Sequence, residues 1–326
     1  MRVLITGGAG FVGLNIAEHL LRQGHTVVSY GMEAPPALAM AALQSLPGQL
    51  SVQIGDVRDG AELLAALQEH QVDCIVHGAA VTAALPREAQ QAPLIAAVNF
   101  GGTIEVLEAA LRQGVRRVVQ LGSGSVFGAT VKAGGSLDED ADVPVPDSLY
   151  GITKYAAERA ALRYRATRGL DVVVARLGVV FGRWEYDTKL RDTLSIPLHL
   201  AQLAEAGQCA RFCDALPDDW VYATDVASAI VALLQAPKLP HGLYHVGTGR
   251  RWSVERWCER LRQAYPDFSY QVVRDPAEAN VGTLAPVPRP PFAISRMQAD
   301  LGYRVEFGEE HAFADYHAWR ESCGRA

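Results

Sequence analysis

The sequence predicts an α/β fold in which a doubly wound parallel sheet carries a smaller C-terminal lobe. Short apolar runs alternate with amphipathic helical patterns through roughly the first 120 residues. A glycine-rich turn directly follows the first of these runs, and small or polar residues follow several later ones. In a sheet of this kind the carboxyl ends of the strands form one edge, where ligands bind.

The elements of the first half follow from local patterns. In the first helix, Val12, Ile16 and Leu20 recur at helical spacing, and Gly24 ends the helix. The predicted strands are Arg2–Thr6, Thr26–Tyr30, Ser51–Ile54, Cys74–His77 and Arg117–Leu121. The predicted helices are Phe11–Gln23, Leu38–Leu46, Ala61–Glu69 and Ala92–Gln113.

The second half is less regular and is expected to form the smaller lobe. Its predicted helices are Ser148–Thr167, Pro197–Ala206, Thr224–Gln235, Val254–Tyr265, Ile294–Leu301 and Gly308–Arg320, and its predicted strands are Val172–Arg176 and Leu243–Val246. Residues 275–292 are proline-rich and are predicted to form a surface loop. We expect a first domain over residues 1–178 and a lobe over 179–326, with residues of about 220–246 returning to the first domain.

The overall composition is that of a globular protein. The chain has 326 residues, of which 49% are hydrophobic and 20% charged, and its net charge is −6. This charge gives no reason to expect nucleic acid or an anionic membrane as a partner, and no apolar run reaches the ~18 residues of a membrane span. The N-terminus begins directly with a strand, and the five cysteines lack C-x-x-C spacing. We therefore expect a cytoplasmic protein with free thiols and without a metal site.

The segment Thr6-Gly7-Gly8-Ala9-Gly10-Phe11-Val12-Gly13 lies between the first strand and the first helix. Its glycines fit both the G-x-G-x-x-G and the G-x-x-G-x-x-G pattern, which provide a tight turn and a close approach of the backbone to a pyrophosphate. The free N–H groups and the partial positive charge of the following helix complete a phosphate site. The turn therefore predicts a Rossmann-type dinucleotide-binding domain.

A second chemical pattern lies in the helix that begins near Ser148. Tyr150 and Lys154 are four residues apart, so both side chains lie on one face of this helix. A tyrosine with an ordinary pKa of ~10 is a poor base at neutral pH, but a nearby lysine ammonium favours the phenolate. Ser123 and Ser125 follow the fifth strand and are expected at the same edge. The combination points to acid/base chemistry beside a bound nicotinamide.

Taken together, these motifs resemble those of the extended short-chain dehydrogenase/reductase family, of the NAD-dependent epimerase/dehydratase type. The resemblance covers nearly the whole length of the chain. Besides the glycine turn, Tyr150 and Lys154, it rests on Gly55-Asp56-Val57, His77-Gly78-Ala79-Ala80, Asn99-Phe100-Gly101-Gly102-Thr103, Trp220-Val221-Tyr222-Ala223-Thr224-Asp225-Val226-Ala227, Ile294-Ser295-Arg296 and Leu301-Gly302-Tyr303.

The resemblance implies a role for each matching residue. Ser123 holds the substrate oxygen, Tyr150 is the catalytic acid/base, and Lys154 binds the nicotinamide ribose and tunes Tyr150. The implied cofactor-binding residues are Gly7, Gly10, Phe11, Val12, Gly13, Asp56, Val57, Ala79, Ala80, Asn99, Tyr150 and Lys154. Asp56 could instead cap a turn, and Asn99 could instead have a purely structural role.

The adenosine end of the cofactor site departs from the family pattern. The second strand should end in an acidic residue that binds the ribose hydroxyls, but Gly31 occupies this position. Glu33 follows two residues later and could reach the ribose from the next loop. No arginine lies between Ser29 and Leu46 to pair with a 2′-phosphate. We therefore expect NAD as the cofactor, with NADP as the alternative.

The substrate end departs as well. The dehydratases of the family place an Asp-Glu pair directly after the residue that corresponds to Ser123, where this chain has Gly124 and Ser125. The nucleotide-sugar members carry an arginine where this chain has Asp218, whose carboxylate would repel a diphosphate.

The remaining candidates for substrate binding are Ser125 and three arginines. Arg289 matches a second arginine of the family. Arg183 and Arg191 could clamp a carboxylate, and Trp184 or Tyr186 could pack on a sugar face. The alternative for this segment is a solvated loop of mixed charge.

These observations favour an NAD-dependent oxidoreductase or epimerase. It would transfer a hydride between nicotinamide and a secondary alcohol of a sugar, a sugar acid or a nucleotide sugar, with Tyr150 as acid/base. Elimination is disfavoured, and Asp218 favours a small polyhydroxy substrate. The alternatives are an NADPH-dependent carbonyl reductase and a non-catalytic cofactor-sensing protein. The resemblance also implies a homodimer that pairs the region Gly102–Leu111 with the Tyr150 helix.

Overall fold

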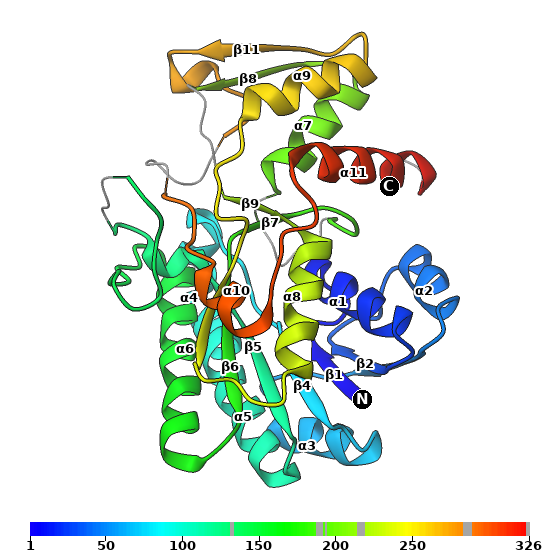
Figure 1. Ribbon diagram of the computed structural model, residues 1–326, viewed down its shortest axis with the longest axis vertical. Coiled ribbons are helices and arrows are strands. Elements are labelled where there is room, and N and C mark those ends of the chain that lie inside the picture. Colours follow the sequence, from blue (N-terminus) through cyan, green and yellow to red (C-terminus); the bar gives the residue numbers. More distant parts are fainter. Residues whose placement is uncertain (131–133, 187–191, 193, 214–218, 283–288, 324–326) are drawn as a thin grey trace.

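A seven-stranded parallel sheet forms the core of the larger domain in the computed structural model (Figure 1), which describes residues 1–130, 134–186, 192, 194–213, 219–282 and 289–323. Across the sheet the strands are β10 (Leu243–Val246), β6 (Val172–Leu177), β5 (Arg117–Ser123), β4 (Cys74–His77), β1 (Arg2–Thr6), β2 (Thr26–Gly31) and β3 (Gln49–Ile54). The strand order reverses between β1 and β4, so the crevice at their carboxyl ends is the expected ligand position.

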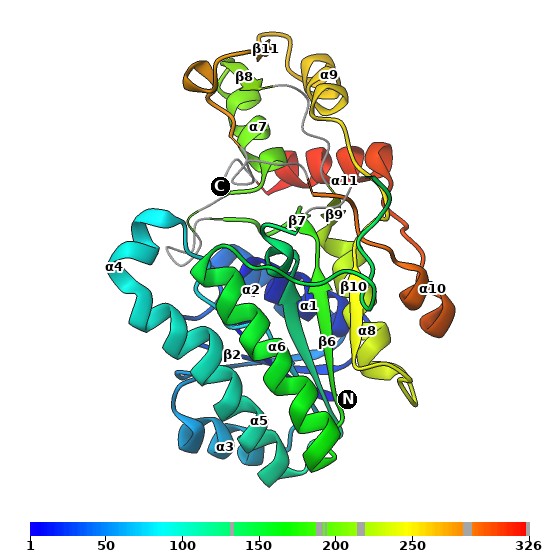
Figure 2. The same cartoon turned by 90° about the vertical axis from the view of Figure 1, so that its left-hand side faces the viewer.

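Helices cover both faces of this sheet (Figure 2). One face carries α1 (Phe11–Arg22), α2 (Ala37–Gln44) and α8 (Ala223–Gln235), and the other carries α3 (Gly60–Glu69), α5 (Gly102–Gln113) and α6 (Leu149–Arg168). Successive side chains of a strand point to opposite faces, so Val3 and Ile5 pack with α1 and α8, whereas Leu4 packs under α3 and α5. Both faces of the sheet are therefore buried, as in other doubly wound folds.

The smaller lobe lies at the upper end of the molecule in Figure 1. It contains α7 (Ile196–Glu205), β8 (Cys209–Cys213), α9 (Val254–Ala264), β11 (Ser269–Val273) and α11 (Glu309–Ser322). Strands β8 and β11 form a small parallel sheet, and β7 (Val179–Phe181) pairs with β9 (Trp220–Tyr222) below it. The fully buried Phe181 ring touches Trp220, Trp252 and Trp257, which join these strands to the lobe.

The predicted fold class is confirmed, and most predicted elements lie within a few residues of those observed. The predicted helix from Ala92 instead consists of three pieces: α4 (Leu85–Ala96), a π-helical turn η1 (Ala97–Gly101) and α5. Four short strands, β7, β8, β9 and β11, were not predicted. The proline-rich stretch contains a 3₁₀ turn, η3 (Pro276–Glu278), and Phe292 pairs with Leu137 in a β-bridge.

The stretch Leu85–Gln113 is long and apolar enough to cross a membrane by length and composition alone. In the fold, non-helical backbone at Gln91 and the π-helical turn interrupt it. Its C-terminal part packs on the sheet through Val106, Leu107 and Ala110. This C-terminal part, α5, therefore serves as a core helix of the α/β domain.

Candidate active site

The glycine turn after β1 forms a cradle against the ends of β2 and β4. Gly7 has a φ of +67°, and a Cβ there would lie 2.9 Å from the amide nitrogen of Ala79. A Cβ on Gly13 would lie 2.5 Å from the Gly7 carbonyl oxygen, so α1 approaches the turn as closely as a glycine permits. Helix α1 begins at Phe11 without a side-chain cap, so the positive end of its dipole faces the turn. The turn fits the pyrophosphate of a dinucleotide.

A buried chain of hydroxyl and imidazole groups fixes the neighbouring end of β4. Thr6 Oγ1 lies 2.7 Å from His77 Nδ1 and accepts hydrogen bonds from the amides of Gly78 and Ala79. On the other side of the ring, His77 Nε2 lies 3.0 Å from Thr103 Oγ1. Burial lowers the pKa of His77 to about 3, with a further contribution from the charge of Lys154. The imidazole is therefore neutral and holds the Ala79–Ala80 end of the strand in place.

The adenosine end of the crevice has polar groups on two loops. Gly31 ends β2, and Glu33 is exposed on the loop that follows. After β3, the side chain of Val57 is buried, and Asp56 accepts hydrogen bonds from the side chain and amide of Arg58. The Arg58 hydrogen bond is the main cause of a lowered pKa at Asp56. These hydrogen bonds stabilise the turn that contains Asp56. Because Asp56 follows the end of β3, it also lies beside the predicted adenine site.

The first turn of α6 lies directly against the loop after β5. Ser148 caps the helix by accepting a hydrogen bond from the amide of Gly151. A Cβ on Gly151 would lie 2.5 Å from the carbonyl oxygen of Ser125, so only glycine allows this approach. Tyr150 precedes Gly151 and is half-buried. The close packing therefore brings Tyr150 beside the loop that carries Ser123 and Ser125.

Ser123 is oriented by its own loop. It ends β5 and caps the 3₁₀ turn η2 (Gly124–Phe127), with Oγ accepting a hydrogen bond of 3.1 Å from the amide of Ser125. A hydroxyl that accepts in this way keeps its proton available for donation. Ser123 can therefore donate a hydrogen bond to an oxygen bound at the strand edge.

Lys154 lies one turn after Tyr150 and is anchored to the sheet. Its Nζ donates a hydrogen bond of 2.6 Å to the carbonyl oxygen of Leu121 in β5. Burial lowers the pKa of Lys154 to about 8, and the negative charge of Glu158 partly opposes this shift. Glu158 is itself held by Arg176 in a buried ion pair. The ammonium is therefore fixed on the face of α6 that carries Tyr150.

Asn99 lies in the π-helical turn between α4 and α5. Its amide group pairs with both backbone groups of Val81, at 2.8 Å and 3.1 Å, and also donates to Thr153 Oγ1 on α6. These contacts tie the loop after β4 to the helix that carries Tyr150. Asn99 therefore positions the backbone around it, which agrees with the purely structural role considered for this residue.

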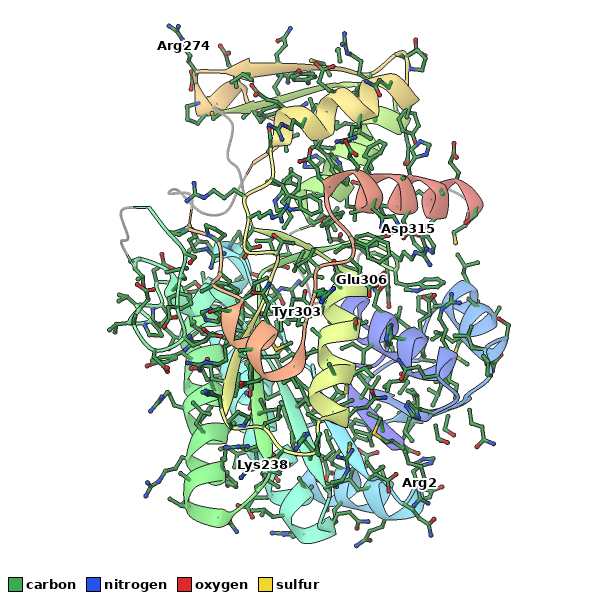
Figure 3. All side chains as sticks on the ribbon, in the orientation of Figure 1. Arg2, Lys238, Arg274, Tyr303, Glu306 and Asp315 are labelled. Carbon is green, nitrogen blue, oxygen red and sulfur yellow. The ribbon has the colours of Figure 1, made fainter. Side chains whose placement is uncertain are left out.

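The segment Gly182–Tyr186, which we call the clasp, is fastened onto α1 and α11 rather than solvated. Arg183 forms ion pairs with Asp315 of α11 and with Glu18 of α1 (Figure 3 labels Asp315). Trp184 is buried and donates from Nε1 to Glu18, and Tyr186 donates a hydrogen bond of 2.6 Å to the Ala9 carbonyl oxygen. The prediction that Arg183 clamps a substrate is therefore not supported, because its guanidinium is already compensated. Local sequence patterns could not reveal this, since Asp315 is 132 positions away.

Of the other substrate candidates, Arg289 reaches the loop after β5. A Cβ on Gly124 would lie 3.3 Å from Nη1 of Arg289. Arg191 and Asp218 lie outside the described residues. Asp219, next to Asp218, is buried and accepts hydrogen bonds from Thr248 and from the amide of Phe292. The structure therefore brings Ser123, Ser125, Tyr150, Lys154 and Arg289 to one edge of the sheet.

Comparisons with known proteins place this geometry in context. Residues 3–247 match the model of the NAD dependent epimerase/dehydratase family. A dTDP-glucose 4,6-dehydratase of Streptomyces niveus is 30% identical over 80% of this chain and 76% of its own length. A 3 beta-hydroxysteroid dehydrogenase/Delta 5-->4-isomerase of Mycobacterium tuberculosis is 38% identical over 56% of this chain and 47% of its own.

Among solved structures, MoeE5 in complex with UDP-glucuronic acid and NAD is similar to this chain. It superposes with a TM-score of 0.80 at 25% sequence identity, and the match covers 99% of each chain. The relatives named here thus include a dehydratase and a dehydrogenase/isomerase.

Proposed function

Because the chain belongs to the NAD dependent epimerase/dehydratase family, we propose that it transfers a hydride between NAD and a secondary alcohol. The proposed substrates are a sugar, a sugar acid or a nucleotide sugar, with Tyr150 as the acid/base. The observation that carries this proposal is the packing of α6 against the loop after β5. This packing supports the proposal because it holds the helix that carries Tyr150 and Lys154 against the loop that carries Ser123.

The residues at the crevice fit the cofactor. Gly7, Gly10 and Gly13 would hold the pyrophosphate with the first amides of α1, at Phe11 and Val12. The other residues proposed to line it are Glu33, Asp56, Val57, Ala79, Ala80, Tyr150 and Lys154, whereas Asn99 holds the loop after β4 in position. When bound, NAD accepts or returns the hydride.

The side chains of this chain supply the proton chemistry. Tyr150, as the phenolate, removes the proton of the substrate hydroxyl, and Lys154 stabilises that phenolate by its charge. Ser123 donates a hydrogen bond to the substrate oxygen, which stabilises the charge that develops there. Gly124 and Ser125 offer no carboxylic acid to protonate a leaving hydroxyl. Net oxidation, net reduction or epimerisation is therefore favoured over dehydration.

A substrate panel tests this function with the Tyr150→Phe variant. Wild-type protein with NAD is expected to form NADH with at least one sugar or sugar acid, or to invert a nucleotide sugar without net NADH. Tyr150→Phe should lower kcat by ~10²–10⁴-fold, because general acid/base transfer contributes that much. Affinity for NADH, measured by fluorescence titration, should change little. Tyr155→Phe on the same helix is the matched control and should retain activity. Activity that survives in Tyr150→Phe would instead favour a cofactor-sensing role.

A further inference from the structure

We infer that the buried ion pair of Glu158 and Arg176 positions the Lys154 ammonium for the reaction, with the Glu158 carboxylate as its counter-charge. The same pair ties α6 to the loop that carries Ser123. This inference rests on the proposed function and names two positioning residues that act through Lys154. It is carried by the burial of the pair, by the elements that the pair joins, and by its place beside Lys154.

The ion pair is enclosed between α6 and the sheet. Glu158 of α6 is 0% exposed and Arg176 of β6 is 2% exposed. Nε and Nη2 of the guanidinium donate hydrogen bonds of 2.6 Å and 2.7 Å to the two carboxylate oxygens. Buried ion pairs are weak evidence of stabilisation, because apolar residues of similar volume often replace them without loss. The place of this pair in the fold therefore indicates more than its contribution to stability.

Arg176 connects this pair to the loop after β5. In the sheet it is the partner of Gly122, the residue before Ser123. Its guanidinium carbon lies 5.0 Å from the centroid of the Phe127 ring, which ends the 3₁₀ turn η2. Its Nη1 also lies 3.3 Å from Nε2 of His245 in β10. The pair therefore fastens α6 and β6 to the turn that Ser123 caps.

Glu158 lies one turn after Lys154 on the same face of α6, which runs along β5 and β6 (Figure 2). The Lys154 ammonium is bound to the carbonyl oxygen of Leu121, the residue next to the strand partner of Arg176. Ammonium and carboxylate thus lie over the same part of the sheet. The charge of Glu158 opposes the effect of burial on the pKa of Lys154. The carboxylate therefore favours the charged form of this lysine.

Two neutral histidines lie around this cluster in the described part of the chain. Burial lowers the pKa of His77 on β4 and of His245 on β10 to about 3. The charges of Lys154 and Arg176, respectively, lower these pKa values further. Neither imidazole therefore adds or removes charge near neutral pH. Glu158 is thus the anion that compensates the ammonium there.

Removing the carboxylate should shift the lysine toward its neutral form. In Glu158→Gln the side chain carries no charge, and Arg176 becomes an uncompensated cation in the same cluster. Both changes disfavour the ammonium, so the pKa of Lys154 should fall from about 8 to ~7 or below. The Tyr150 phenolate then loses the charge that is proposed to stabilise it.

Nuclear magnetic resonance of labelled lysine side chains measures this pKa without turnover. The chain has four lysines, so a sample labelled at the lysine ε-carbon gives few signals, and Lys154→Met assigns the one of interest. We expect Lys154 to titrate near pH 8 in the wild-type apo protein and at least ~1 pH unit lower in Glu158→Gln. An equal pKa in the two proteins would overturn the inference.

Glu205→Gln is the matched control for breaking a buried ion pair. Glu205 of α7 binds Arg320 of α11 through two hydrogen bonds of 2.7 Å, in the smaller lobe. The side chains of both residues are less than one tenth exposed. This variant leaves an uncompensated arginine as Glu158→Gln does, but far from α6. It should leave the pKa of Lys154 unchanged.

A double variant separates positioning from a merely structural role. Glu158→Met combined with Arg176→Met removes the pair without leaving an unpaired buried charge, so the protein is expected to fold. Lys154 still lacks the carboxylate on its own helix, so its pKa should stay below the wild-type value. A wild-type pKa and kcat in the double variant would mean that the pair only stabilises the fold.

The pH profile of kcat connects the pair to the reaction. With a substrate that the wild type turns over, Glu158→Gln should lower kcat at pH 8 about 5-fold or more, because the charged fraction of Lys154 falls from about one half to about one tenth. The alkaline limb of the profile should move to lower pH. Arg176→Lys, which keeps both charges, should leave this limb near its wild-type position.

The two possible failures are distinguishable. A normal wild-type rate with an unmoved alkaline limb in Glu158→Gln would refute the positioning role and leave the proposed function intact. If the wild type turns over no alcohol in the substrate panel, the proposed function fails and the positioning role fails with it.

Discussion

At the scale of one residue, the buried ammonium of Lys154 costs folding free energy because the charge is removed from water. The side chain is buried, and its pKa of about 8 is well below the ordinary 10.5. A shift of this size corresponds to roughly 3 kcal/mol of destabilisation of the charged form. The same desolvated charge, fixed beside Tyr150, is what the proposed chemistry requires.

Replacing this lysine should therefore stabilise the protein while removing activity. At pH 7 the folded state must keep a buried ammonium, so Lys154→Met should raise the free energy of unfolding of the apo protein by about 1–3 kcal/mol. Between pH 8 and pH 10.5 the unfolded wild-type chain binds more protons than the folded one, so its stability rises with pH and the difference from the variant shrinks. Urea unfolding at several pH values measures this effect, with the exposed Lys238→Met as the control. A variant less stable than wild type at pH 7 would show that the buried charge is not costly.

At the scale of elements, the clasp connects the smaller lobe to helix α1. Its residues contact α1 at Glu18, α11 at Asp315 and the glycine turn at Ala9. Asn15 of α1 also donates a hydrogen bond of 2.7 Å to the Arg183 carbonyl oxygen. The backbone of Trp184 has a φ of +64°, an uncommon conformation that these contacts maintain. The clasp therefore couples the turn proposed to bind the pyrophosphate to the smaller lobe.

Loosening the clasp at one bond should weaken cofactor binding. Tyr186→Phe removes the hydrogen bond to the Ala9 carbonyl oxygen, so we expect the Kd for NADH to rise about 3- to 10-fold, the range for one neutral hydrogen bond. Fluorescence titration measures this change. Tyr270→Phe, which removes a hydrogen bond to Glu259 in the distant β11 region, should leave the Kd unchanged. An unaltered Kd in Tyr186→Phe would mean that the clasp does not act on the cofactor turn.

The elements that could be predicted from the sequence are those set by local patterns. Strands β1 and β4 and helix α1 have apolar repeats or glycine signals within a few residues, so they were predicted closely. Strands β7 and β9 have three residues each and exist because they pair with one another across 38 intervening residues. No periodicity is measurable in so short a segment. The family motifs located the predicted catalytic residues, whereas the clasp depends on distant ion pairs that no motif records.

The predicted family, and NAD as its cofactor, are confirmed for the molecule as a whole by the family match and by the NAD-bound structural relative. The predicted homodimer has not been tested by these observations. Phe100 of η1 and Ile152 of α6 are large apolar side chains that are exposed, at 39% and 49%. We call the surface that carries them the α5–α6 face. Ala156 on α6 is half-buried, and its small side chain permits a second pair of helices to approach closely.

We expect this α5–α6 face to form the dimer interface. The wild-type protein should elute as a dimer in size-exclusion chromatography with light scattering, and Phe100→Glu with Ile152→Glu should give a monomer because two charges would be buried in an apolar contact. Val272→Glu, at an equally exposed apolar position on β11, should remain a dimer. A wild-type monomer at micromolar concentration would rule out this assembly.

Direct hydride transfer is most directly measured with a substrate that carries deuterium on the reacting carbon. After turnover with NAD, the nicotinamide product is analysed by mass spectrometry. We predict that one deuterium appears in the reduced cofactor, or is returned to the same carbon if the protein epimerises its substrate, and that Tyr150→Phe transfers it ~10²–10⁴-fold more slowly. Exchange of the deuterium with solvent, or its transfer at the wild-type rate in Tyr150→Phe, would contradict hydride chemistry driven by this tyrosine.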